Sequence, residues 1–406
     1  MQRYFVEPYR FIPPFRGTFW FWAAGRYVLR NLKRKLGVVR WHFDGVELLR
    51  RSLDREAGIL LTPNHSRWAD PPVLGLLGQK AKTYLYFVAS YHLFRLGKVQ
   101  GWLLNRLGGY SIWREGVDRE SIKATAAILA GAERPVVLFP EGTWFRQNDR
   151  VGPLQDGLSL ITRQAARQSS RPIVIHPVGI KYWLLADPTP EVLRRLEALE
   201  RQLGWAPQRH LPTLGRVEKL GGALVAIKEI EYLGQPQPGD LDSRIVRLTE
   251  SQVERLEKQH LGKRFDGWPL ERIRRLRQHL TRQLHDPARA GEREGVQEDL
   301  GDLLFCENLN AHSLEYLRER PSAERLAETV QRIEETVSDA LERPLAPAGA
   351  TVKVGPAIDV RSLGDESLAP RLRVAIQGLI DDMVAQGPPP DWGCPSGPNT
   401  NGRHTG

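Results

Sequence analysis

Short apolar runs alternate with helical patterns between residues 58 and 180, and this order constrains the fold more than any other feature of the sequence. The predicted strands cover residues 58–62, 110–113, 135–139 and 172–180. Helical patterns over residues 121–130 and 157–167 precede the last two strands. This β-α-β-α-β order is typical of an α/β sheet with crossover helices.

Beyond Trp183 the sequence changes to charged amphipathic helical patterns punctuated by Gly and Pro. Predicted helices begin at Thr189 and Pro269, and a third covers residues 326–337. A strand is expected near residues 223–230. No regular repeat is evident in this part of the sequence.

A β pattern, a helical pattern and a tail end the chain. The β pattern covers residues 351–354 and the helical pattern covers residues 372–383. Residues 387–406 are rich in Pro, Gly, Asn and Ser, and we predict that they are disordered. The 406 residues are enough for two or three domains with a sizeable core.

Cysteine content and charge spacing predict a cytoplasmic protein. Cys306 and Cys394 are too few for a disulfide framework and point to a reducing compartment. The longest stretch without Lys, Arg, Asp or Glu is residues 83–94, whereas a membrane-spanning helix needs about 20 mostly apolar residues. Arginines interrupt every apolar run near the N-terminus, so we expect neither a secretory signal nor a transmembrane helix.

The N-terminal segment combines positive charge with aromatic side chains. The formal net charge is +10, and residues 1–43 hold nine basic residues against Glu7 alone. The same segment contains twelve of the 33 aromatic residues, including the run at residues 19–22. In the helical pattern that follows, basic residues fall on one face and apolar residues on the other. Such a segment can bind a membrane interface that contains anionic lipid.

Two other interpretations of this segment stay open. Its aromatic residues can pack on the protein core while its cations form a solvated face, as in ordinary amphipathic helices. A basic and aromatic segment can also bind nucleic acid. Because the sequence has no zinc-finger spacing or RNA-binding signature, we expect no nucleic-acid partner.

A second basic stretch lies in the helix predicted from Pro269 onward. Its arginines are Arg272, Arg274, Arg275 and Arg277. This face can meet a membrane or an acidic carrier protein, or it can simply be a solvated helix face.

Three polar clusters directly follow predicted strands, where open α/β sheets place their sites. The first contains His65 in a connection and Asp70 at the start of a helix. A carboxylate on one ring nitrogen fixes the tautomer of an imidazole and raises the basicity of the other nitrogen, as a general base requires. The alternative is a helix N-cap beside a loop histidine, because a His-x4-Asp pattern defined by only two residues is unspecific.

The other two clusters follow later strands. The second, Phe-Pro-Glu-Gly-Thr, ends in Glu141, Gly142 and Thr143, and read alone it predicts a plain turn. The third ends at Arg114, whose planar guanidinium can bind a phosphate or can be an ordinary surface cation.

The joint order of these blocks resembles the glycerolipid acyltransferase family, which includes the 1-acylglycerol-3-phosphate acyltransferases. The blocks are Asn-His-x4-Asp, Gly-x-x-x-Ile-x-Arg, Phe-Pro-Glu-Gly-Thr and the strand at residues 173–180. Phe-Pro-Glu-Gly-Thr is the most specific of them. The resemblance implies a mixed α/β sheet flanked by helices. It also implies that His65 is the general base and that Asp70 orients it.

The resemblance implies further roles around the acceptor. Asn64 would shape the loop, Arg114 would hold the phosphate of a glycerophosphate-type acceptor, and Glu141, Gly142 and Thr143 would organise the acceptor site. The donor would be a thioester, acyl-CoA or acyl carrier protein, and no metal or other cofactor is expected. The chain accordingly has no Gly-x-Ser-x-Gly elbow and no nucleotide-binding loop.

Two residues depart from the family pattern. Arg67 stands two residues after the histidine, where the family commonly has Ser, and Trp144 stands where it commonly has Arg. Arg67 either replaces the missing charge at the phosphate or pairs with an acidic side chain, and both interpretations stay open. These departures bear on the acceptor head group rather than on acyl transfer.

The resemblance divides the chain into five parts. Residues 1–45 would be a basic aromatic membrane-interface segment with an amphipathic helix, and residues 46–183 the α/β core. Residues 184–350 would be a large, mostly helical insertion. Residues 351–386 would be the closing strand and helix of the core, and residues 387–406 a disordered tail.

These observations predict an O-acyltransferase of phospholipid biosynthesis, peripheral on the cytoplasmic membrane face. It would move a fatty acyl chain from acyl-CoA or acyl carrier protein to a lysophospholipid such as 1-acylglycerol 3-phosphate. One alternative is a non-catalytic lipid-binding or scaffold protein on the same fold, although such a protein need not keep His65, Asp70, Glu141 and Gly142 together. The other is an acyltransferase for glycerol 3-phosphate or an amino-acid lipid.

Overall fold

The structure is a computed structural model with two compact units. The described residues are 8–155, 157–267, 269–310, 314–338, 344–363 and 367–393. One unit, here called the sheet unit, comprises residues 9–186 and 346–395. The other, here called the helical unit, consists mainly of residues 187–345.

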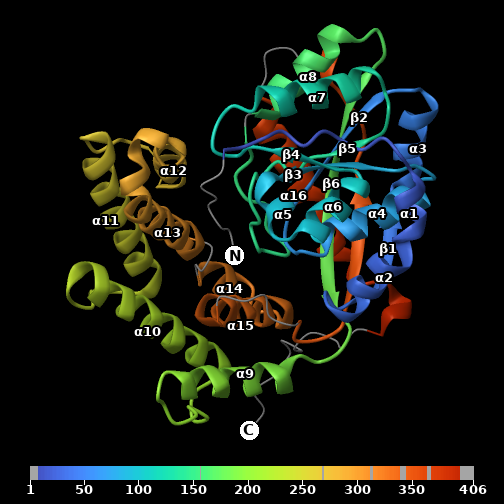
Figure 1. Ribbon diagram of the computed structural model, residues 1–406. Helices are drawn as coiled ribbons and strands as arrows, with labels where there is room; N and C mark the ends of the chain where they lie inside the picture. The colour runs from blue at the N-terminus through green and yellow to red at the C-terminus, as the bar shows by residue number, and fades with distance from the viewer. Residues whose placement is uncertain are drawn as a thin grey trace. The chain divides into compact units, whose positions relative to one another are not determined.

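A mixed eight-stranded sheet forms the centre of the sheet unit (Figure 1). Its strands are β1 (Val38–Asp44), β2 (Gly58–Pro63), β3 (Tyr86–Ser90), β4 (Gly109–Ile112), β5 (Val136–Val137), β6 (Ile173–Leu184), β7 (Ala348–Val354) and β8 (Ile358–Asp359). Their order is β1-β7-β6-β2-β5-β3-β4, with β8 beside β6. β6 is antiparallel to β7 and β8, and the other pairings are parallel. The predicted mixed α/β sheet is confirmed.

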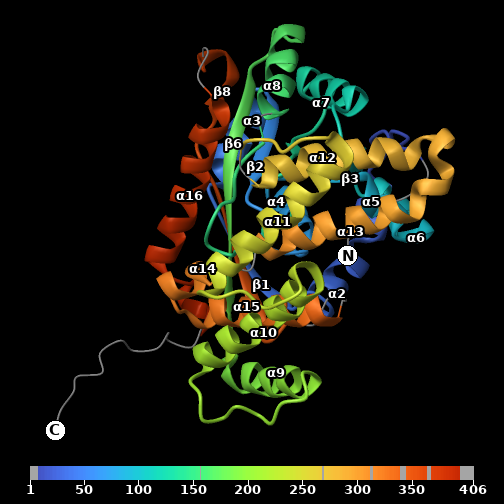
Figure 2. The ribbon, with the colours of Figure 1, turned by 90° about the vertical axis from the view of Figure 1, so that its left-hand side faces the viewer.

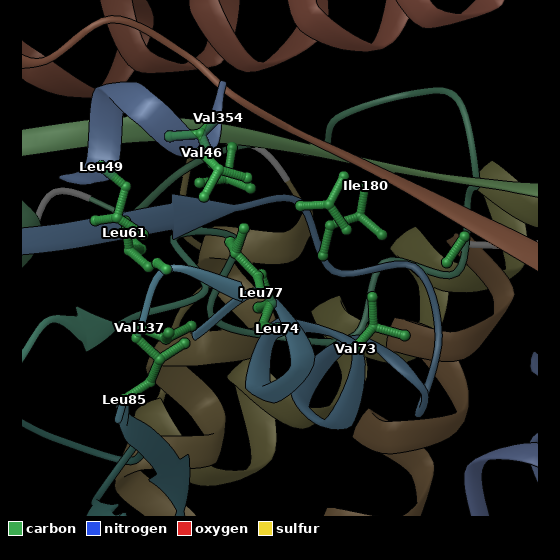
Figure 3. Packing of buried hydrophobic residues seen from close by; sticks show 14 of the residues in the cluster. Val46, Leu49, Leu61, Val73, Leu74, Leu77, Leu85, Val137, Ile180 and Val354 are labelled. Carbon is green, nitrogen blue, oxygen red and sulfur yellow. The ribbon is translucent and has the colours of Figure 1, made fainter. Parts of the chain in front are cut away.

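Helices cover both faces of this sheet. The helices are α1 (Phe19–Ala23), α2 (Gly25–Arg34), α3 (Val46–Asp54), α4 (Asp70–Lys80), α5 (Tyr91–Arg95), α6 (Lys98–Arg106), α7 (Arg119–Ala130), α8 (Gly157–Gln168) and α16 (Leu368–Gln386). α2, α3 and α4 pack on one face, in a buried cluster with Leu61 and Leu77 (Figure 3). α7, α8 and α16 pack on the other face around Leu60, and α16 runs alongside β6 (Figure 2). Leu60 and Leu61 face opposite clusters because successive strand residues alternate between faces.

The four strands predicted between residues 58 and 180 are present, but the sequence analysis missed β1, β3 and the two-residue strand β8. β1 lies within the basic N-terminal segment and has a largely half-exposed pattern, so no apolar run marks it. β3 lies inside the uncharged stretch of residues 83–94. β7 and α16 contain the residues predicted as the closing strand and helix.

β6 is longer than its neighbour β2 and continues past it. Pro63 at the end of β2 pairs with Val178, so the next residues of β6 extend beyond the carboxyl end of β2. This extension pairs with β7, and Leu184 at the end of β6 lies opposite Ala348 at the start of β7. The extension therefore carries side chains of β6 to the edge of the sheet where β2 ends.

The N-terminal segment packs on the sheet unit along part of its length, and residues 1–7 lie outside the described chain. In α2 the apolar face contacts the core, because Leu32 is buried and Leu29 packs against the same cluster. In α1, by contrast, Phe19 and Trp22 are 61% and 78% exposed. The core-packing interpretation therefore describes α2, whereas aromatic side chains of α1 face solvent.

Helices make up the described part of the helical unit, together with a 3-10 turn at Pro287–Glu292. They are α9 (Thr189–Gln202), α10 (Thr213–Leu233), α11 (Leu241–Leu261), α12 (Pro269–His285), α13 (Arg293–Asn310), α14 (Glu315–Glu319) and α15 (Ala323–Ser338). The strand expected near residues 223–230 is wrong, because these residues lie in α10. The run is apolar, but its Ala, Leu, Lys and Glu residues are strong helix formers. Val225 and Glu229 are buried four residues apart, on one helix face.

One ion-pair arrangement, here called the Glu–Arg latch, recurs at three successive helix junctions. A buried glutamate near the end of one helix pairs with the arginine that is fourth in the next helix. The pairs are Glu200–Arg216, Glu229–Arg244 and Glu257–Arg272, at N–O distances of 2.7, 2.7 and 2.8 Å. The glutamates also accept backbone N–H groups of the connecting loops, from Gln208, Gln237 and Phe265. The latch arginines are 28 residues apart, so the structure shows a repeat that the sequence analysis did not find.

The latches formed by Glu200 and Glu229 depend on ionised carboxylates. Burial opposes the charged form, but the arginine and the loop N–H outweigh it, so the pKa values of Glu200 and Glu229 lie below the ordinary value of 4.5. A carboxylate with a depressed pKa stabilises the fold fully above its unfolded-state pKa. The stabilisation from these two latches is therefore lost as the pH falls below about 4.5.

Replacing Arg244 by methionine should destabilise the latch between α10 and α11 by about 3–5 kcal/mol, because the buried Glu229 carboxylate is left without its partner. Hydrogen exchange followed by mass spectrometry would report this as faster exchange in α10 and α11. Arg209→Met is the matched control, since it removes an exposed ion pair with Glu197 and should change exchange little. Equal protection in wild type and Arg244→Met would contradict the role of the latch.

Two of the four arginines in the basic stretch of α12 are buried in the helical unit, whereas Arg274 is half-buried and Arg275 is exposed. Arg272 is buried in a latch, and Arg277 is buried and pairs with Glu307 at 2.6 Å. Arg275 places its guanidinium 4.4 Å from the centre of the Phe265 ring. Arg272 and Arg277 thus pair with glutamates of neighbouring helices, and the solvated-face interpretation describes Arg275.

The prediction of a disordered tail is wrong for residues 387–393, which the structure describes. Pro390–Trp392 form a 3-10 turn in which Trp392 is buried. The Trp392 ring lies against Gly349 of β7, where even a Cβ atom would be 2.2 Å from the ring. This contact fixes the segment, and residues 394–406, with Cys394, lie outside the described chain.

Candidate functional site

The carboxyl ends of β2, β4, β5 and β6 lie at one edge of the sheet, because parallel pairings link these strands. The three polar clusters predicted from the sequence follow β2, β4 and β5. The topology therefore brings His65, Arg114 and Glu141 to the same edge. Contacts confirm their proximity, since the N–H of His65 donates to Oε1 of Glu141 at 2.8 Å.

His65 and Asp70 form a hydrogen-bonded pair, with Nδ1 of His65 2.8 Å from Oδ2 of Asp70. The Asp70 side chain is fully buried, whereas 21% of the His65 side chain is exposed. Because a carboxylate only accepts hydrogen bonds, Nδ1 carries the proton and Nε2 has a lone pair available for another proton. The imidazole also stacks on Phe139, with ring centroids 3.9 Å apart. Both contacts fix the orientation of the ring.

Both oxygens of the Asp70 carboxylate accept hydrogen bonds. Oδ2 accepts the N–H groups of Ser66 at 2.8 Å and Arg67 at 3.0 Å, in addition to His65. Oδ1 accepts the hydroxyl of Tyr182 at 2.6 Å. Although Asp70 is the first residue of α4, its carboxylate turns back to the preceding loop and the N-cap position belongs to Ala69. A simple N-cap therefore does not describe this geometry.

Two buried asparagines hold the extension of β6. Asn64 accepts from the N–H of Ile180 at 2.7 Å and donates to its carbonyl at 3.0 Å. Asn148 makes the same two bonds with Tyr182, at 2.7 and 2.8 Å. Asn64 thus contacts β6 rather than the open side of the site. The sequence analysis missed Tyr182 and Asn148. The two residues are 34 positions apart, and no local sequence pattern indicates that they pair.

Glu141 supports the loop that carries the histidine. Its side chain is buried and accepts the N–H groups of His65 at 2.8 Å and Gly152 at 3.2 Å. Burial raises the pKa of Glu141 to about 8, although these two N–H groups favour the anion. Glu141 therefore acts on the backbone of His65 and titrates near neutral pH.

The turn after Glu141 is tied to Arg114. Gly142 has a φ of 69°, a left-handed conformation that favours glycine. Its carbonyl accepts from Nη1 of Arg114 at 2.9 Å. Thr143 follows in a partly buried position. The predicted residues of the second and third clusters thus meet at this turn.

Arg67 and Trp144, the two departures from the family pattern, both lie beside the histidine loop. The guanidinium of Arg67 lies 4.7 Å from the centre of the Tyr182 ring. Trp144 donates its indole N–H to the carbonyl of Ser66 at 2.6 Å. Arg146, which the sequence analysis missed, stacks on the Trp144 ring at 4.2 Å. Arg146 lies two residues after Trp144, the position where the family commonly has Arg, and this spacing could have indicated it.

Neither a metal cluster nor a membrane span is found in the parts of the chain that the structure describes. In these residues no group of three or more His, Cys, Asp or Glu side chains could hold a metal ion. Among the same residues no helix has the length and apolar character needed to cross a membrane.

Comparison with known proteins agrees with the site. A family model described as Acyltransferase matches residues 41–181, which include His65, Asp70, Arg114 and Glu141. The chain is also similar to a 1-acyl-sn-glycerol-3-phosphate acyltransferase of Streptococcus pneumoniae (strain ATCC BAA-255 / R6), with 28% identity over 112 residues. The matched stretch covers 28% of this chain and 39% of the relative, so the similarity spans well under half of either protein.

Proposed function

We propose that this protein transfers a fatty acyl chain to the hydroxyl of a lysophospholipid such as 1-acylglycerol 3-phosphate. The match of residues 41–181 to the Acyltransferase family model and the similarity to a 1-acyl-sn-glycerol-3-phosphate acyltransferase support this proposal. The donor is a thioester, either acyl-CoA or acyl carrier protein, and the proposed reaction needs no metal or other cofactor. The observation that carries the proposal is the His65–Asp70 pair at the carboxyl edge of the sheet. The proposed place of action is the cytoplasmic face of a membrane.

His65 is the general base of the proposed reaction. Its Nε2 accepts the proton of the acceptor hydroxyl while the hydroxyl oxygen attacks the thioester carbonyl. Collapse of the tetrahedral intermediate completes the new ester and breaks the C–S bond, and the imidazolium gives its proton to the departing thiolate. Asp70 stabilises the imidazolium between these steps. Since a thioester is already activated, the reaction requires no covalent enzyme intermediate.

Three arginines around the histidine loop support a phosphate-bearing acceptor. They are Arg67 on the Tyr182 ring, Arg114 at the Gly142 turn and Arg146 on the Trp144 ring. Guanidinium groups bind phosphate well because their planar donors match its oxygens. Glycerol 3-phosphate meets the same criterion, so it is the leading alternative acceptor. An amino-acid lipid does not offer a phosphate.

Transfer of labelled acyl chains would test this function. Acyl-CoA and acyl carrier protein would be supplied separately, with lysophospholipids, glycerol 3-phosphate and an amino-acid lipid as acceptors. We expect transfer to 1-acylglycerol 3-phosphate by the wild type and transfer about 10²–10⁴-fold slower by His65→Ala. Equal low turnover in both proteins, with lipid binding retained, would instead support a lipid-binding scaffold.

We further propose that α1 and α6 form the membrane-docking surface of the sheet unit. Phe19 and Trp22 of α1 and Val99 of α6 are 61%, 78% and 76% exposed. Trp20 and Trp102 join the two helices, with ring centroids 4.6 Å apart. Exposed aromatic and apolar side chains of this kind insert into the headgroup region of a bilayer. The exposed Arg26 and Arg30 of the neighbouring α2 would attract anionic lipid.

Val99→Asp should weaken binding to vesicles that contain anionic phospholipid by about tenfold, because it places a charge where an apolar side chain would be buried. Vesicle flotation over a range of lipid concentrations would measure the change. Val374→Asp is a matched control, since Val374 of α16 is 74% exposed but lies apart from this surface in the sequence. The same affinity for both variants would place membrane binding elsewhere.

A further inference from the structure

The buried hydroxyl of Tyr182 is a feature of the site that no motif predicted. Tyr182 follows the last residue of the family match and lies in the extension of β6. Resting on the proposed acyl transfer, we propose that Tyr182 is a positioning residue. Its hydroxyl orients the Asp70 carboxylate toward His65, and its ring positions Arg67.

The hydrogen bonds of Asp70 show why a donor at Oδ1 matters. Oδ2 accepts from Nδ1 of His65 and from the N–H groups of Ser66 and Arg67. Tyr182 supplies the donor for Oδ1, at 2.6 Å. With one oxygen held by the loop and the other by β6, the carboxylate plane cannot rotate. The His65 ring is thereby fixed through its bond to Oδ2.

Tyr182 can hold Asp70 because its own position is fixed. The residue is fully buried, and Asn148 pairs with both its N–H and its carbonyl. On the other side of the strand it lies opposite Ala350 of β7. Burial and the neighbouring Asp70 charge raise the pKa of Tyr182 well above its ordinary value, so the hydroxyl remains a donor at working pH.

The ring of Tyr182 also contacts Arg67, one of the arginines proposed to bind the acceptor phosphate. The Arg67 guanidinium lies 4.7 Å from the ring centre, within the range of a cation–π interaction. Arg67 is also linked to Asp70 through its backbone N–H. One side chain therefore contacts both the partner of the general base and an arginine proposed to bind phosphate.

Tyr182→Phe removes the hydroxyl and keeps the ring, so it separates the two contacts. We expect kcat to fall about 10–100-fold, because the lost hydrogen bond is to a charged group, while KM for the acceptor stays within twofold because the ring still holds Arg67. Tyr110→Phe is the matched control. Tyr110 is a fully buried tyrosine of the same unit whose hydroxyl bonds to Thr125, and its loss should leave kcat unchanged.

A double-mutant cycle tests whether the effect passes through Asp70. In an Asp70→Ala background, Tyr182→Phe should change the residual kcat by less than twofold. An equal fall in both backgrounds, or a kcat for Tyr182→Phe within twofold of wild type, would overturn the proposal.

A spectroscopic measurement separates this proposal from the acyl transfer on which it rests. The Nδ1–H proton of His65 should give a hydrogen-bonded NMR resonance that shifts in Tyr182→Phe and not in Tyr110→Phe. If Tyr182→Phe does not fold, 3-fluorotyrosine at position 182 keeps the ring and hydroxyl but strengthens the donor, and should shift the same resonance. An unmoved resonance would overturn the positioning role. Absent turnover in wild type with the expected shift would refute only the proposed reaction.

Discussion

Loss of the imidazole in His65→Ala is expected to lower kcat by about 10²–10⁴-fold, because a positioned general base contributes that much to proton transfer. The neighbouring Asp70 is not placed to take over the role of the His65 imidazole in its absence. The Asp70 carboxylate is buried and occupied by several donors, so it cannot reach an acceptor hydroxyl in place of the imidazole. Steady-state rates with 1-acylglycerol 3-phosphate and a saturating thioester donor would measure the loss.

His42→Ala is the matched control for this experiment. His42 belongs to β1 of the same unit and pairs with Asp44 at 2.8 Å, but its side chain is 48% exposed and follows none of the strands that end at the site. This variant should keep the wild-type kcat. A His65→Ala protein that folds normally and retains more than half of the wild-type turnover would rule out general-base catalysis by this residue.

Asp70→Asn is expected to lower kcat by about 10²–10³-fold, with the histidine still in its original tautomer. Three donors point at Oδ2, so the amide oxygen of asparagine should take that place. The NH₂ group then faces Tyr182, whose hydroxyl can rotate to accept a hydrogen bond. The variant therefore removes the negative charge that stabilises the imidazolium while Nδ1 keeps an acceptor.

Asp118→Asn is the control for loss of a buried carboxylate. Asp118 accepts from Tyr9 and from the N–H groups of Trp113 and Ser121, so its replacement should cost stability without affecting the chemical step. Both variants would be compared in kcat and in thermal midpoint. An Asp70→Asn enzyme within threefold of the wild-type kcat would show that the imidazolium does not need this charge.

Sequence patterns located the parts of the site that follow strands. His65, Arg114 and Glu141 each come within three residues of the end of a predicted strand, and parallel pairing placed these strand ends at one edge. Patterns could not show that Glu141 holds the backbone of His65, because 76 residues separate them and the contact depends on sheet order. Sequence patterns could not predict the role of Tyr182 for a similar reason, because that role depends on how far β6 extends past β2.

The sequence analysis did not find the repeat in the helical unit because the spacing between its defining residues varies. Each latch needs a glutamate, a glycine that ends the helix and an arginine in the next helix. The glycines Gly204, Gly234 and Gly262 all have left-handed φ values. The first glycine follows its glutamate by four residues and the other two by five, so the sequences do not align without a gap. The remaining positions need only be apolar or solvated, and they therefore vary freely.

The pairing of Leu184 with Ala348 determines how the helical unit is connected to the sheet unit. The polypeptide leaves the sheet unit after β6 and re-enters it at β7, and these two points are neighbours in an antiparallel ladder. An ordinary hairpin turn could join them. About 160 residues thus connect two neighbouring strands of the sheet unit, at a kind of position where domain insertion is tolerated. The sheet therefore needs no part of the helical unit to complete the pairing of β6 with β7.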